Sequence, residues 1–249
     1  MTALPTYDAD QLAQVLGMLP DVDSVELKLT VPGADHHRVV AALGIDVLTA
    51  RIRQVVFLDT TDLRLSAAGL VIRARRTQGR DGDVTVKLRP MMPADGPAAM
   101  RGREGSKVEL DASPAGFTCS CSLTTQVADR KVRALIGGES GLLRKLLGSA
   151  QRAVVDDHLP AGTRLDDVAA LGPVTLLKAK FAPDGARAMT AELWFLPDGS
   201  RILELSTKAP PAQAFQAAAE TKVLLASHGI DLGAPQETKT RAALAALTG

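Results

Sequence analysis

Charged side chains recur at every second position in several short stretches of this 249-residue sequence. The first stretch is SVELKLTV at residues 24–31, where Glu26 and Lys28 alternate with valine and leucine. Side chains at positions i and i+2 of a β-strand project from the same side of a sheet. Buried charges are costly unless they pair or bind a ligand. An enclosed charged face would therefore be a binding site, whereas a solvent-facing one would be an ordinary polar exterior.

The same alternation predicts eight strands along the chain. In each strand, apolar residues fall on one face and charged or polar residues on the other. The predicted strands are 24–31, 53–59, 69–76, 83–90, 106–112, 174–181, 189–196 and 201–208. Eight strands are enough for an antiparallel sheet to close into a barrel.

Helical patterns lie between and after these strands, at 36–43, 127–136, 140–150, 211–229 and 237–247. Helices need apolar surface to pack on, and the apolar faces of the strands would supply it. This arrangement would place the helices outside and turn the charged faces into a tunnel. An open antiparallel sheet, with helices on one side and solvent on the other, fits the periodicity equally well.

Composition limits the class of protein. Hydrophobic residues make up 46% of the chain and the formal net charge is +1, so the core is ample and any anion site must be local. We therefore expect neither a nucleic-acid nor a membrane partner. The opening MTALPTYDAD lacks the features of a signal peptide, and no stretch approaches the roughly 18 apolar residues that span a bilayer. These features predict a cytoplasmic location.

The chain has two cysteines, Cys119 and Cys121, in a stretch that we expect to be a loop. They are too close to form an unstrained disulfide, and no Cys or His cluster accompanies them at zinc spacing. We predict that neither one forms a disulfide or binds a metal.

The stretch QVVFLDTTDLRLSAAGLVIRARR resembles the signature of the CYTH superfamily, the triphosphate tunnel metalloenzymes. In that signature, a strand ending in an aromatic residue, Asp and Thr precedes Asp-Leu, a leucine, Gly-Leu and two alternating arginines. The corresponding residues are Phe57, Asp59, Thr60, Asp62, Leu63, Leu65, Gly69, Leu70, Arg73 and Arg75.

The likeness extends through SVELK, VTVKLR, KVELD and GSRILELSTK over most of the chain. It implies an α+β fold in which an eight-stranded antiparallel β-barrel forms a tunnel with helices packed on the outside. It also implies one domain over 1–249, with an N-terminal extension at 1–20 and a helical insertion at about 113–170.

The resemblance assigns roles to the charged faces. The residues expected to bind a triphosphate are Lys28, Arg73, Arg75, Lys87, Arg89, Lys178 and Lys180. The acids expected to hold Mg²⁺ or Mn²⁺ are Glu26, Glu109, Asp111, Glu192 and Glu204, of which Glu26 and Glu204 are the catalytic candidates. Arginine presents a planar fork to phosphate oxygens and lysine a compact charge, while hard divalent cations prefer carboxylate and water oxygens.

We expect seven of these side chains to point into one enclosed interior. They are Glu26, Arg73, Lys87, Glu109, Lys178, Glu192 and Glu204. Trp194 should also point inward, by the same alternation.

The chain departs from the family pattern at Ser24 and Ser206, where the family has acids on the metal side. Losing two carboxylates should weaken divalent-ion binding, because ligand charge is a main determinant of affinity for hard cations. Lys208 and Lys239 could line a tunnel mouth, although solvated lysines are the more common case.

Three functions remain open at this stage. The first is metal-dependent hydrolysis of inorganic triphosphate or a small organic triphosphate. The second is a catalytically weak or inactive protein that binds triphosphate, nucleotide or polyphosphate, which the two serines favour. The third is a class IV-type adenylate cyclase, which would need an adenine pocket that the sequence does not identify.

Overall fold

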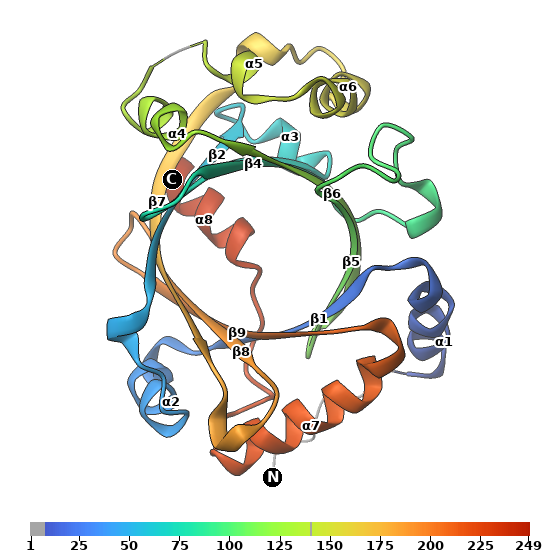
Figure 1. Cartoon of the computed structure of the whole chain (residues 1–249), viewed down its shortest axis with the longest axis vertical. Helices are drawn as coiled ribbons and strands as arrows, with labels where there is room; N and C mark the ends of the chain where they lie inside the picture. The colour runs from blue at the N-terminus through green and yellow to red at the C-terminus, as the bar shows by residue number, and fades with distance from the viewer. Residues whose placement is uncertain (1–7, 140) are drawn as a thin grey trace.

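The nine strands of the described residues form one closed barrel, seen end-on in Figure 1. The computed structural model describes residues 8–139 and 141–249. Around the barrel the strands follow the order β1-β5-β6-β4-β3-β2-β7-β8-β9. Their bounds are β1 Ser24–Val31, β2 Arg51–Asp59, β3 Leu70–Thr77, β4 Gly82–Leu88, β5 Ser106–Ser113, β6 Gly116–Val127, β7 Ala169–Phe181, β8 Met189–Phe195 and β9 Arg201–Ala209.

The prediction of eight antiparallel strands was wrong in two respects. A ninth strand, β6, occupies the start of the segment predicted as a helical insertion, and it carries both cysteines. Its inward side chains are serine and threonine, so the alternation of apolar and charged residues that revealed the other strands is missing. The barrel is also mixed, because β1 pairs with β5 in parallel from Ser24 opposite Glu109 to Leu27 opposite Ala112.

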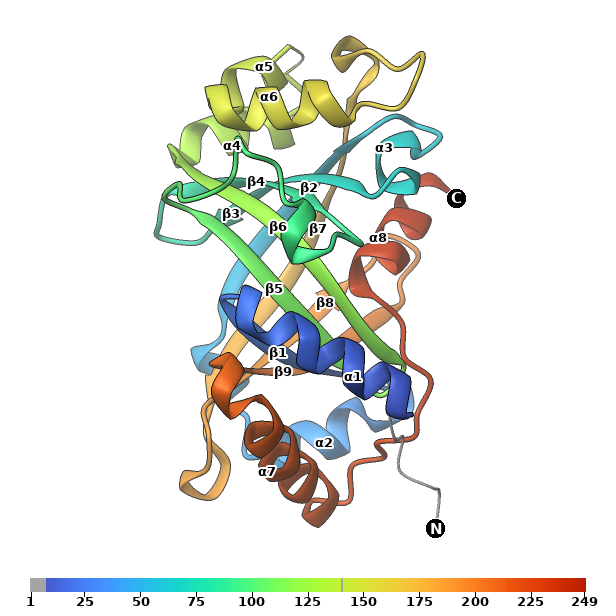
Figure 2. The same ribbon diagram turned by 90° about the vertical axis from the view of Figure 1, so that its right-hand side faces the viewer.

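The outer face of the barrel is apolar and carries most of the helices (Figure 2). One side of the barrel wall is covered by α3 (Arg64–Ala67), α4 (Asp129–Ile136), α5 (Leu143–Leu146) and α6 (Ser149–His158). The opposite side is covered by α1 (Ala9–Met18), α2 (His36–Ala42) and α7 (Ala214–Ser227). Burying each valine or leucine of this face contributes about 1.5–3 kcal/mol, so the outward apolar faces fix which way the charged faces point. None of the described helices is long and apolar enough to cross a membrane.

Helix α8 (Lys239–Thr248) is an exception to the prediction that the helices lie outside. Figure 1 shows it within the outline of the ring. Its residues Ala242, Ala243 and Leu244 pack in one buried cluster with Phe57 and Trp194. The inward faces of β2, β7, β8 and β9 are apolar at this end of the barrel, and α8 fills that end.

The loop of the family signature shapes the connection between β2 and β3. The Asp59 carboxylate accepts backbone hydrogen bonds from Thr60 at 2.8 Å and from Leu65 and Ser66 at 2.9 Å each. Leu63 takes a left-handed conformation with φ 58°. The signature residues of this loop therefore have a structural role, whereas Phe57 before it and the two arginines after it face the barrel interior.

Candidate functional site

The seven side chains expected to share an enclosed interior all project from the interior face of the barrel. Their chain neighbours carry the outer apolar clusters: Ile72 and Ala74 flank Arg73, and Leu203 and Leu205 flank Glu204. Because the barrel is closed, the opposite face of each strand is its interior. The predicted placement is confirmed, while the chemical roles of these residues remain predictions.

Asp111 forms the first group of interior contacts. Its carboxylate is 4% exposed and lies 2.9 Å from Lys28 Nζ, 3.3 Å from Arg89 Nη1 and 3.7 Å from Lys87 Nζ. Burial alone would raise the pKa of Asp111, but these three cations hold it below its usual value. Lys28 of β1, together with Lys87 and Arg89 at the end of β4, thus surrounds this one acid of β5.

Lys208 forms the second group by bridging two acids. Its Nζ contacts Glu109 and lies 3.8 Å from Glu26 Oε2. Ser24 Oγ donates a long hydrogen bond of 3.5 Å to Glu109 Oε1. Burial opposes ionisation of Glu109, yet Lys208 keeps the pKa of this carboxyl below its usual value. Lys208 is therefore part of the interior network.

Lys239, at the start of α8, forms the third group. Its Nζ contacts Glu192 and lies 2.7 Å from Glu204 Oε1. Glu192 also lies 3.0 Å from Lys178 Nζ and 3.9 Å from Arg53 Nη1. Although burial opposes the charged forms, this pairing raises the pKa of Lys239 and holds that of Glu192 well below its usual value. The expectation of a solvated Lys239 was wrong, because the helix that carries it enters the barrel.

Trp194 points inward as predicted and is 2% exposed. Its Nε1 donates a hydrogen bond of 3.4 Å to Glu192 Oε2, and Lys239 Nζ lies 5.5 Å from its ring centroid. The ring packs in the same buried cluster as α8. It therefore closes one end of the interior and does not offer a free stacking face.

Arg73 differs from the other interior bases because it forms no ion pair within the described part of the chain. Its Nε is buried without a hydrogen-bond partner, as is Arg53 Nε. The neighbouring Arg75 is already held by Asp83, with Nη2 2.9 Å from Oδ2. Burial, and then the charge of Arg75, lowers the pKa of Arg73. A buried donor without a partner is costly, so Arg73 is the residue best prepared to bind an anion.

Lys87 is the interior lysine whose pKa is lowered furthest among the described residues. Burial lowers its pKa to about 8, against an opposing effect of Asp111. Its charge is therefore sensitive to pH close to neutrality. An anion bound beside it would favour the charged form.

Lys180 was expected in the phosphate-binding set but lies outside the network. It is exposed near the end of β7, one register position beyond the pair Ala179 and Ala191. The alternation of residues predicts on which face of the strand Lys180 lies, but not how deep in the barrel it lies. Conversely, sequence reasoning missed Arg53 and Asp83, although each lies two residues before an interior position, Val55 and Thr85.

The acids expected to bind a metal occur in pairs that share a lysine. Glu26 and Glu109 share Lys208, and Glu192 and Glu204 share Lys239. No group of three or more His, Cys, Asp or Glu residues suited to a metal occurs in the described ranges. Mg²⁺ is commonly held by one or two carboxylates together with water and substrate phosphates. Each pair fits such a site once its lysine moves away.

The two cysteines lie on a strand, and the expectation that they lie in a loop was wrong. Cys119 and Cys121 are free and buried on the outer face of β6. Burial raises the pKa of both thiols, that of Cys119 to about 11. Neither residue belongs to the interior site.

Comparison with known proteins gives likeness at the level of structure. No family model and no curated protein matches the chain. One similar structure is a Hippeastrum protein, described as a candidate adenylyl cyclase with a dominant triphosphatase activity. The two sequences are 14% identical, and their structures superpose with a TM-score of 0.62 over 87% of this chain and 93% of the Hippeastrum chain. A candidate adenylate cyclase from Bacillus halodurans is 13% identical with a TM-score of 0.60, covering 88% and 96%. At these identities the likeness concerns the fold alone: the chain shares the barrel fold of these two proteins.

Proposed function

We propose that the barrel interior binds a linear triphosphate or a similar small polyphosphate and, with a divalent cation, hydrolyses it. The observation that carries this proposal is Arg73, whose Nε is buried without a hydrogen-bond partner and which forms no ion pair among the described residues. An anion with several oxygens would satisfy its donors and those of Arg53. Arginine suits this task because its planar fork binds two phosphate oxygens at once.

The charge balance of the interior supports the same conclusion. Nine bases face six acids, a net charge of +3. The bases are Lys28, Arg53, Arg73, Arg75, Lys87, Arg89, Lys178, Lys208 and Lys239. The acids are Glu26, Asp83, Glu109, Asp111, Glu192 and Glu204. A polyanion would neutralise the excess positive charge.

Either acid pair would hold the divalent cation of the proposed reaction. Glu192 with Glu204, or Glu26 with Glu109, would hold Mg²⁺ or Mn²⁺ together with water and phosphate oxygens. The cation would polarise the phosphoryl group. Glu26 and Glu204 are the carboxylates proposed to orient the attacking water. Arg73 and Lys87 would fix the anion and stabilise its charge.

Binding without hydrolysis is the second candidate function. Every acid of the expected metal set contacts a lysine or arginine. Ser24 and Ser206 also leave the interior with two fewer carboxylates than the family pattern. Both features favour a protein that holds a polyphosphate but uses metal poorly. No observation on the described residues favours the adenylate cyclase alternative.

Phosphate release from inorganic triphosphate, ATP and thiamine triphosphate tests the proposal, with and without Mg²⁺ or Mn²⁺. We expect metal-dependent release that Arg73→Met abolishes or strongly reduces. Arg133→Met is the matched control, because this side chain is 64% exposed on α4 and far from the interior. Tight calorimetric binding without release would select the second candidate. Neither binding nor release with any compound would refute both.

A further inference from the structure

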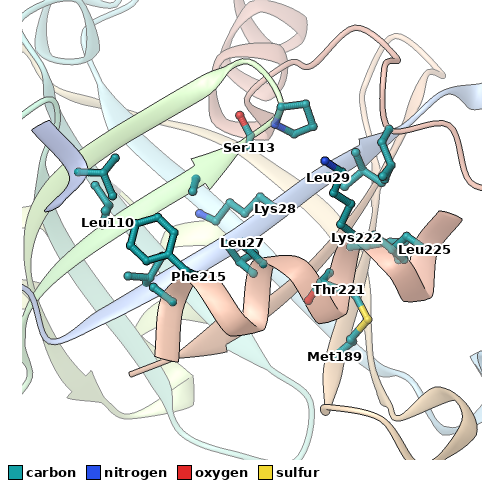
Figure 3. Close-up of a pocket in the computed structure, with 18 residues that line it drawn as sticks. Leu27, Lys28, Leu29, Leu110, Ser113, Met189, Phe215, Thr221, Lys222 and Leu225 are labelled. Atoms are coloured by element: carbon teal, nitrogen blue, oxygen red, sulfur yellow. The ribbon is translucent and has the colours of Figure 1, made fainter. Parts of the chain in front are cut away.

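A separate cavity of about 210 Å³ lies outside the barrel, between α7 and the outer faces of β1, β5 and β9 (Figure 3). Helix α7 contributes Ala214, Ala218, Thr221 and Leu225 from one face. The strands contribute apolar side chains such as Leu110 and, on the opposite side, Leu205 and Met189. The cavity is therefore apolar over most of its lining.

The cavity exists because two packing clusters fail to meet beneath α7. One cluster contains Val25, Leu110 and Ala214, and the other contains Leu205 and Leu225. Between them α7 presents the small side chain of Ala218. The pairing of β1 with β5 also ends here, at Leu27 opposite Ala112. An unfilled apolar cavity lowers stability, so an apolar ligand that fills it would be favoured.

Among the described residues, the charged side chains that line the cavity are two lysines, Lys28 and Lys222, without an aspartate or glutamate. Lys28 Nζ is already paired, at 3.3 Å from Glu26 and 2.9 Å from Asp111. Lys222 is half-buried and forms no ion pair or hydrogen bond in the described ranges. The cavity thus combines an apolar interior with one unpaired cation at its wall.

We propose that this cavity binds a single-chain anionic amphiphile, with its carboxylate on Lys222 and its apolar chain between α7 and the strands. The ligand class is a short or medium-chain fatty acid anion, because one positive charge and a small apolar volume match one carboxylate and one chain. A lysine stem that merely covers apolar surface is the simpler interpretation of Lys222. The two interpretations predict different affinities for a fatty acid anion when the charge of Lys222 is removed.

Titration calorimetry on the full chain with decanoate, below its micellar concentration, tests the proposal. We expect saturable binding with one site, and much weaker binding of decanol and decyltrimethylammonium. Lys222→Met should weaken decanoate about tenfold or more, since a charge-assisted contact is lost. Ala218→Leu should abolish binding by filling the cavity. Thermal unfolding of the Ala218→Leu variant is recorded first, to show that it folds. If it does not fold, Lys222→Met tests the proposal independently.

Two controls separate this site from others. Lys131→Met removes an exposed lysine on α4 and should leave decanoate affinity unchanged. Arg73→Met should also leave it unchanged, because the barrel interior is a different site. Several outcomes would overturn the proposal: no decanoate binding, equal binding of the cationic amphiphile, or unchanged affinity in Lys222→Met. Phe215 is an exposed residue of α7 that also lines the cavity. If the chain forms a dimer in sedimentation that Phe215→Ser dissociates, a second copy of the chain covers this face, which would overturn the proposal.

Discussion

At the scale of single residues, burial in the barrel changes the pKa and the hydrogen bonding of individual side chains. Lys87 is the clearest case, because burial lowers its pKa to about 8 while Asp111 partly restores the charge. Arg73 is a second case, as a guanidinium whose Nε has no partner. Both residues lie on the inward faces of neighbouring strands, β3 and β4. Together they would form the part of the interior that responds most to a bound anion.

The Lys87 shift predicts how anion binding depends on pH. Lys87 is mostly charged below pH 8 and mostly neutral above it, so triphosphate affinity should fall as pH rises through about 8. Binding above that pH should take up a proton, because the anion favours the charged lysine. Calorimetry from pH 6.5 to 9.5 in two buffers measures both effects. Lys87→Met should lose this dependence, and a flat wild-type profile would refute the assignment.

Arg73 and Arg75 form a matched pair of variants with different expected effects. Arg73→Ala should weaken triphosphate binding by about 1.5–3 kcal/mol, the range for charge-assisted hydrogen bonds, with little change in folding. Arg75→Ala leaves the buried Asp83 without its partner and should lower the free energy of unfolding by about 3 kcal/mol. Urea unfolding and calorimetry distinguish the two. Equal binding by wild type and Arg73→Ala would remove Arg73 from the site.

At the scale of elements, β1 and β9 carry the two departures from the family pattern. Ser24 lies on β1 near Glu109, and Ser206 is buried on β9 opposite Lys28 and Thr190. Both face the interior, as the resemblance implied. Helix α8 acts on the same region, since Lys239 occupies the space between Glu192 and Glu204. At these two positions β1 and β9 thus carry hydroxyl groups instead of carboxylates, and α8 adds the ammonium group of Lys239 between Glu192 and Glu204.

Restoring the acids tests this arrangement. Ser24→Glu with Ser206→Glu should lower the metal concentration for half-maximal phosphate release, or create release where there was none. The two added charges would reduce the interior from +3 to +1, so metal-free triphosphate binding should weaken. These opposite responses separate a metal-site effect from a change in stability. If neither response occurs, the two positions do not contribute to the site.

At the scale of the whole molecule, one closed barrel encloses an ionic network that its apolar outer face holds in place. The network links all three groups of contacts: Lys28 of the first group lies 3.3 Å from Glu26 of the second, and the charges of Glu109 and Glu192 both act on Arg73. It also makes folding depend on pH. The acids Glu109, Asp111 and Glu192 have lowered pKa values, whereas Lys208 and Lys239 have raised ones.

The lowered pKa values of these acids predict how the free energy of unfolding changes at acid pH. A carboxyl whose pKa is lowered on folding adds stability above its unfolded value, here about 4, and loses it as pH falls through the folded value. The free energy of unfolding should therefore drop steeply below pH 4. Urea unfolding from pH 2.5 to 7 measures the drop, and Glu192→Gln should reduce it. A constant free energy over that range would contradict the network.

Much of this architecture follows from the sequence, and the exceptions have physical reasons. Alternation identified eight strands and their inward faces, because a charge every second residue leaves a clear signal. Strand β6 gave no such signal, since its inward residues are Ser120, Ser122 and Thr124. Alternation also reports face but not depth, so it placed the exposed Lys180 with the buried Lys178. The partner of each acid was not predictable, because the partners come from different strands.

Whether the barrel interior holds a polyphosphate can be observed in a crystal structure grown with inorganic triphosphate and without metal. We expect triphosphate density inside the barrel, with phosphate oxygens within hydrogen-bond distance of Arg73 and Lys87. The same crystals of Arg73→Met should lack that density or show it at lower occupancy. Triphosphate bound only on the outer surface, or an interior with the same ion pairs and no ligand at saturating concentration, would contradict the account.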